Sequence, residues 1–144
     1  MRILALDVGE KNIGLAISDE LGWTAQGLPT LRYQENTEAL LEITNVVKEN
    51  NVSEIVVGMP INMDGSLGKK AKEVVSFLES LQKEVSVPIK LWDERMSSVQ
   101  AEKLMLKADL SRKKRKKKVD QLAAQIILQT YLDSRGNTSQ KDDV

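Results

Sequence analysis

Three carboxylates in separate parts of the sequence have the greatest potential for chemistry. Asp7 ends one apolar segment, Glu94 follows another, and Asp120 begins an alanine-rich segment. The chain has no histidine and no cysteine, which excludes imidazole bases, thiolate nucleophiles and zinc sites built from those residues. Carboxylate oxygens are good ligands for hard divalent ions, and two such ions can activate water without imidazole. The set is therefore typical of metal-dependent phosphodiester hydrolysis.

Each carboxylate also has a purely structural interpretation. Asp7 could cap the turn after its strand, Glu94 could be an ordinary loop residue, and Asp120 could favour the dipole of its helix. Asp7, however, interrupts a segment that should be buried, where an unpaired charge is costly. We therefore favour a functional role for Asp7 over a purely structural one. Glycosidases also use paired carboxylates, but two Trp, two Tyr and one Phe are few for a sugar-binding cleft.

Two further segments could contact a polyanion. Residues 58–68 link an expected strand to an expected helix at the edge of the sheet where the carboxylates should gather. Seven consecutive cations follow later, namely Arg112, Lys113, Lys114, Arg115, Lys116, Lys117 and Lys118. Formal net charge is zero, so the rest of the chain is acidic. Such a run is usually a solvated surface, but next to Asp120 it could bind a nucleic-acid backbone.

The segments expected to position these residues are strands first, and then alternating helices and strands. Strands are predicted over 2–8, 13–18, 27–33, 54–58 and 87–92, and helices over 36–50, 68–84, 97–107 and 119–132. We expect the first two strands to form a hairpin, the third to lie at an edge because of Pro29, and Asn36 to cap the first helix. This order predicts an α/β domain with a mixed five-stranded sheet, three strands antiparallel and then parallel, flanked by helices.

The length and hydropathy of the chain limit its organisation. A chain of 144 residues, 41% of them hydrophobic, fits one domain. We expect this domain over residues 1–133 and a polar, disordered tail over 134–144. No apolar stretch approaches the roughly 20 residues that span a bilayer, so we expect a cytoplasmic protein without a membrane partner.

The ordered motifs resemble the YqgF family, also called RuvX-like Holliday junction resolvases or pre-16S rRNA nucleases. The resemblance runs from Met1 to about Leu132. It depends on four blocks, which are Leu6-Asp7-Val8-Gly9-x-Lys11-x-Ile13-Gly14-Leu15-Ala16-Ile17-Ser18-Asp19, Val57-Gly58-Met59-Pro60 with Asn62-Met63-Asp64-Gly65, Trp92-Asp93-Glu94-Arg95, and Val119-Asp120-x-x-Ala123-Ala124. The chain departs from the family at Asn12, where Arg is common, and at Ser97-Ser98, where Ser/Thr-Thr is frequent.

The resemblance implies an RNase H-like fold and a bacterial cytoplasmic nuclease that matures the 5′ end of 16S rRNA. It makes Asp7, Glu94 and Asp120 catalytic ligands of Mg²⁺ or Mn²⁺, with two ions expected. Lys11, Asn62, Arg95 and the run over 112–118 are expected to contact structured nucleic acid, above all precursor rRNA, in a monomer or homodimer.

Three alternatives accompany this interpretation. The protein could be a Holliday junction resolvase acting on four-way DNA junctions, or a non-catalytic RNA-binding factor in ribosome assembly. An actin-like ATPase shares the opening Asp-x-Gly motif. It would need a second such domain, for which 144 residues are too few.

Overall fold

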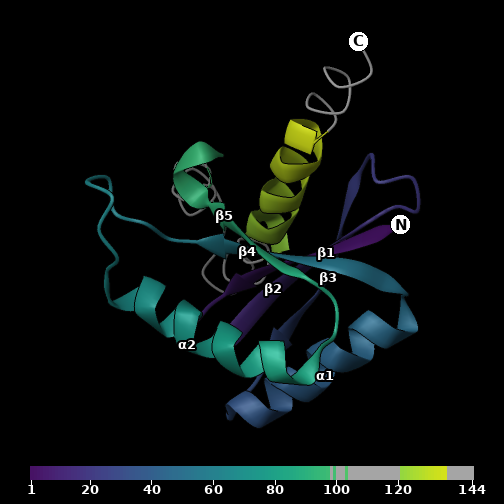
Figure 1. Ribbon diagram of the computed structural model, residues 1–144, viewed down its shortest axis with the longest axis horizontal. Helices are drawn as coiled ribbons and strands as arrows, with labels where there is room; N and C mark the ends of the chain where they lie inside the picture. Colours follow the sequence, from purple (N-terminus) through teal and green to yellow (C-terminus); the bar gives the residue numbers. More distant parts are fainter. Residues whose placement is uncertain (98, 100–102, 104–120, 136–144) are drawn as a thin grey trace, which may run out of the picture.

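Five strands form one mixed sheet in the computed structural model, which describes residues 1–97, 99, 103 and 121–135 (Figure 1). The strands are β1 (Arg2–Val8), β2 (Asn12–Ser18), β3 (Ala25–Arg32), β4 (Val52–Met59) and β5 (Ile89–Asp93). Their order is β3-β2-β1-β4-β5, with antiparallel pairing from β3 to β1 and parallel pairing of β4 with β1 and β5. The predicted hairpin, the edge position of the Pro29 strand and the mixed sheet are confirmed.

Helices cover both faces of this sheet, as predicted. Helices α1 (Asn36–Glu49) and α2 (Lys69–Glu84) pack on one face, and a helix over residues 121–135, here called the C-terminal helix, crosses the other (Figure 1). A short 3₁₀ helix, η1 (Glu94–Met96), follows β5. Within the described part of the chain, no helix has both the length and the apolar character needed to cross a membrane.

The observed bounds of the strands lie within two residues of the expected ones, and two helix ends differ in ways that concern capping and the expected tail. Asn36 does not cap α1: the N-cap position belongs to Glu35, whose side chain makes no capping hydrogen bond, and Asn36 is the first helical residue. The C-terminal helix continues through residue 135, two residues into the expected tail, while residues 136–144 lie outside the described residues. Of the helix expected over 97–107, residues 99 and 103 are helical and most of the others lie outside the described residues.

Side-chain alternation along β1 divides the core into two layers. Leu4, Leu6 and Val8 belong to the cluster under α1 and α2, whereas Ile3 and Ala5 belong to the cluster under the C-terminal helix. Successive side chains of a strand point to opposite faces, so Asp7 lies on the same face as Ala5. The small residues of β1 and β2 on that face meet Ala123 and Ala124, which lets the C-terminal helix lie close to the sheet.

A buried glutamate fixes the far end of the C-terminal helix. Glu54 of β4 is 6% exposed and accepts a hydrogen bond of 2.5 Å from the Tyr131 hydroxyl. Its other carboxylate oxygen lies 3.0 Å from Nη1 of Arg135, and Lys90 Nζ lies 3.4 Å from Oε1. The Tyr131 ring also meets Trp92 edge to face, with centroids 5.8 Å apart. A buried charge with three polar partners explains why the helix extends to Arg135.

Replacing Tyr131 with phenylalanine should therefore destabilise the fold by about 1.5–3 kcal/mol, because the lost hydrogen bond ends on a buried charge. The matched control is Tyr33→Phe, which removes a hydroxyl bonded to the neutral carbonyl of Gly9 and should cost only about 0.5–1.5 kcal/mol. Urea unfolding of both variants measures the difference. Equal losses in the two variants would contradict the importance of the Glu54 charge.

Candidate functional site

Two of the three predicted carboxylates meet at the carboxyl-terminal edge of the sheet. Asp7 lies near the end of β1 and is 6% exposed, and Glu94 begins η1 and is 4% exposed. The two side chains interact, since the charge of Asp7 and a side-chain hydrogen bond to Asp7 both raise the pKa of Glu94, although β4 separates their strands in the sheet. Asp120 and the basic run over 112–118 lie outside the described residues. The structure therefore brings Asp7 and Glu94 together and leaves the place of Asp120 a prediction.

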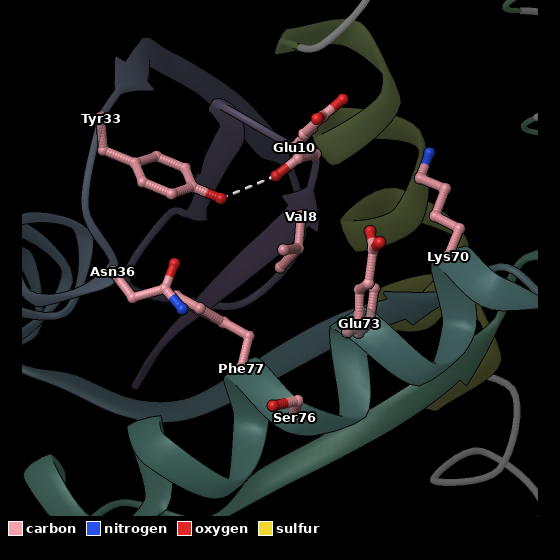
Figure 2. A pocket seen from close by; sticks show the side chains of 10 residues that line it. Val8, Glu10, Tyr33, Asn36, Lys70, Glu73, Ser76 and Phe77 are labelled. Atoms are coloured by element: carbon pink, nitrogen blue, oxygen red, sulfur yellow. Dashed lines mark hydrogen bonds between the residues drawn. The ribbon is translucent and has the colours of Figure 1, made fainter.

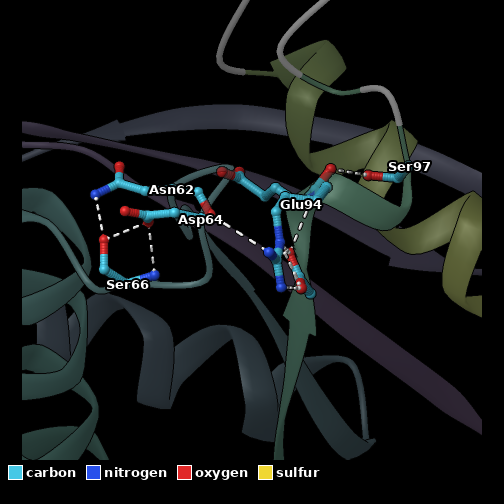
Figure 3. Close-up of polar contacts among 7 residues, drawn as sticks. Asn62, Asp64, Ser66, Glu94 and Ser97 are labelled. Atoms are coloured by element: carbon cyan, nitrogen blue, oxygen red, sulfur yellow. Dashed lines mark hydrogen bonds and ion pairs between the residues drawn. The ribbon is translucent and has the colours of Figure 1, made fainter.

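The turn that follows β5 carries Glu94 onto the sheet. Asp93 caps η1, since its Oδ1 accepts a hydrogen bond of 2.9 Å from the backbone N–H of Arg95. Ser97 closes the turn by donating its backbone N–H and its hydroxyl to the Glu94 carbonyl, both at 3.2 Å (Figure 3). The backbone of Glu94 is thus held on both sides, and its side chain is directed by a rigid turn.

Gly58 makes room for the Glu94 side chain. It lies in β4 opposite Trp92 of β5. A Cβ atom placed on Gly58 would lie 3.0 Å from Oε1 of Glu94 and 2.5 Å from Cδ1 of Ile127. The missing side chain lets the carboxylate and the C-terminal helix occupy the same small space. Glycine inside a strand is a sequence signal for such a close approach, although we expected Gly58 only to begin a loop.

The site carries opposed charges. Burial raises the pKa of Glu94 above its usual range, and the charge of Asp7 and the hydrogen bond to Asp7 raise it further, whereas Lys103 and Lys70 oppose the shift. The Lys103 ammonium lies 3.1 Å from Oδ2 of Asp7. Two buried carboxylates in contact repel each other when both are ionised. The pair therefore favours either a shared proton or a nearby cation.

This donor set fits a hard divalent ion. The side chains of Asp7 and Glu94 are buried and offer oxygen ligands. The ammonium group of Lys103 already forms an ion pair with Asp7, which shows that a cation fits beside this carboxylate. Among the described residues, no group of three or more acidic, histidine or cysteine side chains is placed to hold a metal. A third carboxylate ligand would have to come from elsewhere in the chain, and Asp120 is the residue expected from the sequence.

The loop beside the site is tied to η1. Arg95 forms a salt bridge of 2.7 Å with Asp93, which raises the pKa of Arg95, and its Nη1 donates to the Asn62 carbonyl at 3.4 Å (Figure 3). The amide of Asn62 donates to the Ser66 hydroxyl at 3.1 Å, and that hydroxyl donates to Asp64 at 2.6 Å. Arg95 therefore anchors the loop to the turn that holds Glu94.

The expected nucleic-acid contacts are placed around the same edge. Asn62 and Arg95 are engaged in the bonds described above, and Lys11 is exposed in the turn between β1 and β2. Contact of these three side chains with nucleic acid stays a prediction. Sequence reasoning missed Lys70 and Lys103, because a lysine on an amphipathic helix carries no signal that distinguishes a site residue from a solvated one.

The comparisons with known proteins agree over nearly the whole chain. A family model described as "RuvX: Holliday junction resolvase" matches residues 1–134. A protein of Desulforamulus reducens named "Putative pre-16S rRNA nuclease" is 49% identical over 134 residues, covering 93% of this chain and 98% of its own. A protein of Bacillus cytotoxicus with the same name is 50% identical over 137 residues, covering 94% and 100%.

Solved structures share the fold at low sequence identity. RuvC of T. thermophilus in complex with a Holliday junction substrate matches with a TM-score of 0.58 and 15% identity, covering 93% of this chain and 96% of its own. The fowlpox virus Holliday junction resolvase matches with a TM-score of 0.52 and 14% identity, covering 93% and 99%. These likenesses confirm the RNase H-like fold.

Proposed function

Because this chain belongs to the RuvX family of Holliday junction resolvases, we propose that it is a nuclease that hydrolyses phosphodiester bonds of structured nucleic acid with bound divalent metal ions. The observation that carries the proposal is the contact between the buried carboxylates of Asp7 and Glu94. Burying two like charges side by side is costly, and a bound cation would offset that cost. We place the protein in the cytoplasm.

Asp7, Glu94 and Asp120 would hold the ions, which we propose are two Mg²⁺ or Mn²⁺. Bound there, they supply an activated water and stabilisation of the leaving oxygen. The chain's own residues do the positioning. Asp93 and Ser97 hold the backbone of Glu94, and Gly58 leaves the space in which its carboxylate lies.

Lysine charges make the site accessible to a phosphate. Lys103 pairs with Asp7, and the charge of Lys70 acts on Glu94. Together they reduce the repulsion that a phosphodiester would meet on approaching two carboxylates. Lys11, the loop after β4 and the run over 112–118 would extend the contact along the backbone of the nucleic acid.

Precursor 16S rRNA is the substrate we propose, since relatives that are about half identical over their whole length carry that name. A four-way DNA junction is the second candidate, favoured by the description of the matching family. Both are polyanions with bent or interrupted helices, so charge alone does not separate them.

One cleavage experiment separates these functions. The full chain is incubated with a labelled precursor 16S 5′ fragment and, separately, with a labelled four-way DNA junction, in Mg²⁺, Mn²⁺ or EDTA. We expect metal-dependent cleavage of the RNA and no cleavage in EDTA. Symmetric cutting of the junction alone would make the protein a DNA resolvase. RNA binding without cleavage in either metal would make it an assembly factor.

A further inference from the structure

A second feature at the same edge of the sheet is a cavity of about 280 Å³ between β1, the start of α1 and α2 (Figure 2). We call it the β1–α2 cavity. Its apolar lining includes the buried side chains of Val8, Tyr33, Val74 and Phe77. Its rim consists of exposed polar and charged side chains, namely Glu10, Asn36, Lys70, Glu73 and Ser76.

The aromatic lining is fixed in place. The Tyr33 hydroxyl donates a hydrogen bond of 2.8 Å to the Gly9 carbonyl, and the Tyr33 backbone N–H donates to the Lys11 carbonyl at 3.0 Å (Figure 2). Burial raises the pKa of the Tyr33 phenol, and the charges of Glu73 and Glu10 raise it further. The Tyr33 phenol thus stays protonated and donates its hydrogen bond at neutral pH. The negative charges of Glu73 and Glu10 therefore extend to the wall of the cavity that Tyr33 forms.

The cavity adjoins the candidate catalytic site. Val8, which lines it, directly follows Asp7 in β1, and their side chains point to opposite faces of the sheet. Lys70 belongs to the cavity rim, and its charge also acts on Glu94. A nucleic-acid strand lying across this edge would therefore meet the carboxylates with one phosphate and the cavity with a neighbouring base.

We propose that the β1–α2 cavity binds an extruded nucleobase of the substrate beside the phosphodiester at Asp7 and Glu94, an inference that rests on the proposed nuclease function. A base has two apolar faces and a polar edge, which match an apolar lining with a polar rim. Two glutamates against one lysine on the rim disfavour a phosphate there. Carboxylates accept hydrogen bonds from exocyclic amino groups, so the cavity favours adenine, guanine or cytosine over uracil.

Binding to RNA with single missing bases tests this inference. Short precursor 16S fragments, each with one abasic nucleotide, are titrated against the Glu94→Gln protein in Mg²⁺, so that binding is measured without cleavage. Loss of the captured base should weaken binding by about 5- to 150-fold, the range for one base stacked on an aromatic side chain. Other single positions should change binding less.

The cavity is then altered at its exposed rim, where folding should be unaffected. In the Glu94→Gln protein, the further changes Asn36→Ala and Glu73→Gln should weaken binding of the intact RNA. Removing the captured base from the RNA should then weaken binding no further. The matched control is Glu79→Gln, an exposed glutamate of α2 that does not line the cavity. It should retain the abasic effect.

The outcomes separate this inference from the nuclease function. An abasic effect that is absent at every position, or unchanged by the rim variant, overturns the base site even if wild-type protein cleaves RNA. A position-specific abasic effect that the rim variant removes supports the site. If wild-type protein then cleaves neither RNA nor the DNA junction, the nuclease function fails, and the cavity is the base-binding site of a non-catalytic RNA-binding protein.

Discussion

Replacing Glu94 with glutamine is expected to reduce metal-dependent cleavage more than about 100-fold, since loss of a residue that merely supports a metal ligand already costs 10- to 100-fold. The same variant should melt at a higher temperature than wild type at neutral pH in EDTA. Glutamine keeps the shape and a hydrogen-bonding group for Asp7 but removes the charge that burial and Asp7 both disfavour. Each kcal/mol relieved would add about 2–4 °C in a chain of this size.

The contribution of Glu94 to the stability of the fold should change with pH in a definite direction. The pKa of Glu94 is raised in the folded protein, so between its ordinary value and the raised one the folded state binds more protons than the unfolded state. The Glu94 contribution therefore favours folding at low pH and is lost as the pH rises through the raised pKa. Glu94→Gln should not lose stability in this way as the pH rises. Thermal melts of both proteins in EDTA, from acidic to neutral pH, would measure the difference.

Glu54→Gln is the matched control, because Glu54 is equally buried but is surrounded by Tyr131, Arg135 and Lys90. Removing its charge should lower the melting temperature and leave cleavage per folded molecule near the wild-type level. If Glu94→Gln also lowered the melting temperature, or retained cleavage, Glu94 would be a structural residue and the metal site would be wrong.

Replacing Gly58 with alanine should reduce cleavage, with about 100-fold as the upper bound, since that is the cost of moving a catalytic group by roughly 1 Å and Glu94 needs to move less than this. The added Cβ would meet Oε1 of Glu94 at 3.0 Å and Cδ1 of Ile127 at 2.5 Å, so both side chains must move. Overpacking of this kind should also destabilise the fold by about 1–3 kcal/mol. Cleavage rates and urea unfolding measure the two effects separately.

A second variant separates displacement of Glu94 from general destabilisation. Ile127→Val removes the methyl group that the new Cβ would strike, so Gly58→Ala with Ile127→Val should recover stability. Cleavage should stay low in the double variant, because the contact with Glu94 persists. Recovery of cleavage together with stability would show that Gly58 serves the packing of the C-terminal helix and not the position of Glu94.

Local patterns in the sequence predicted most of the architecture. The apolar runs around Asp7 and before Asp93 predicted strands at the right places, and the helical spacing of apolar residues predicted α1 and α2. Helix caps were harder to predict, as Asn36 shows: it has a good capping side chain, but the helix begins at that residue and not after it. Capping depends on the backbone angles of a single residue, which neighbouring packing decides.

The sequence by itself determined which groups are available for chemistry. Without histidine or cysteine, only carboxylates, lysines and hydroxyls could serve, and the position of Asp7 in a buried strand already distinguished it. These properties depend on residue type and on neighbours in the chain, which are visible in the sequence.

Only the tertiary structure decided which charges surround Asp7 and Glu94. Lys70 and Lys103 come from segments far from Asp7 along the chain, and nothing in their local sequence distinguishes them from other surface lysines. Gly58 contacts Glu94 because β4 lies between β1 and β5, an order set by parallel crossover connections. Through-space electrostatics and close packing depend on distances between remote segments, and those distances exist only once the sheet has formed.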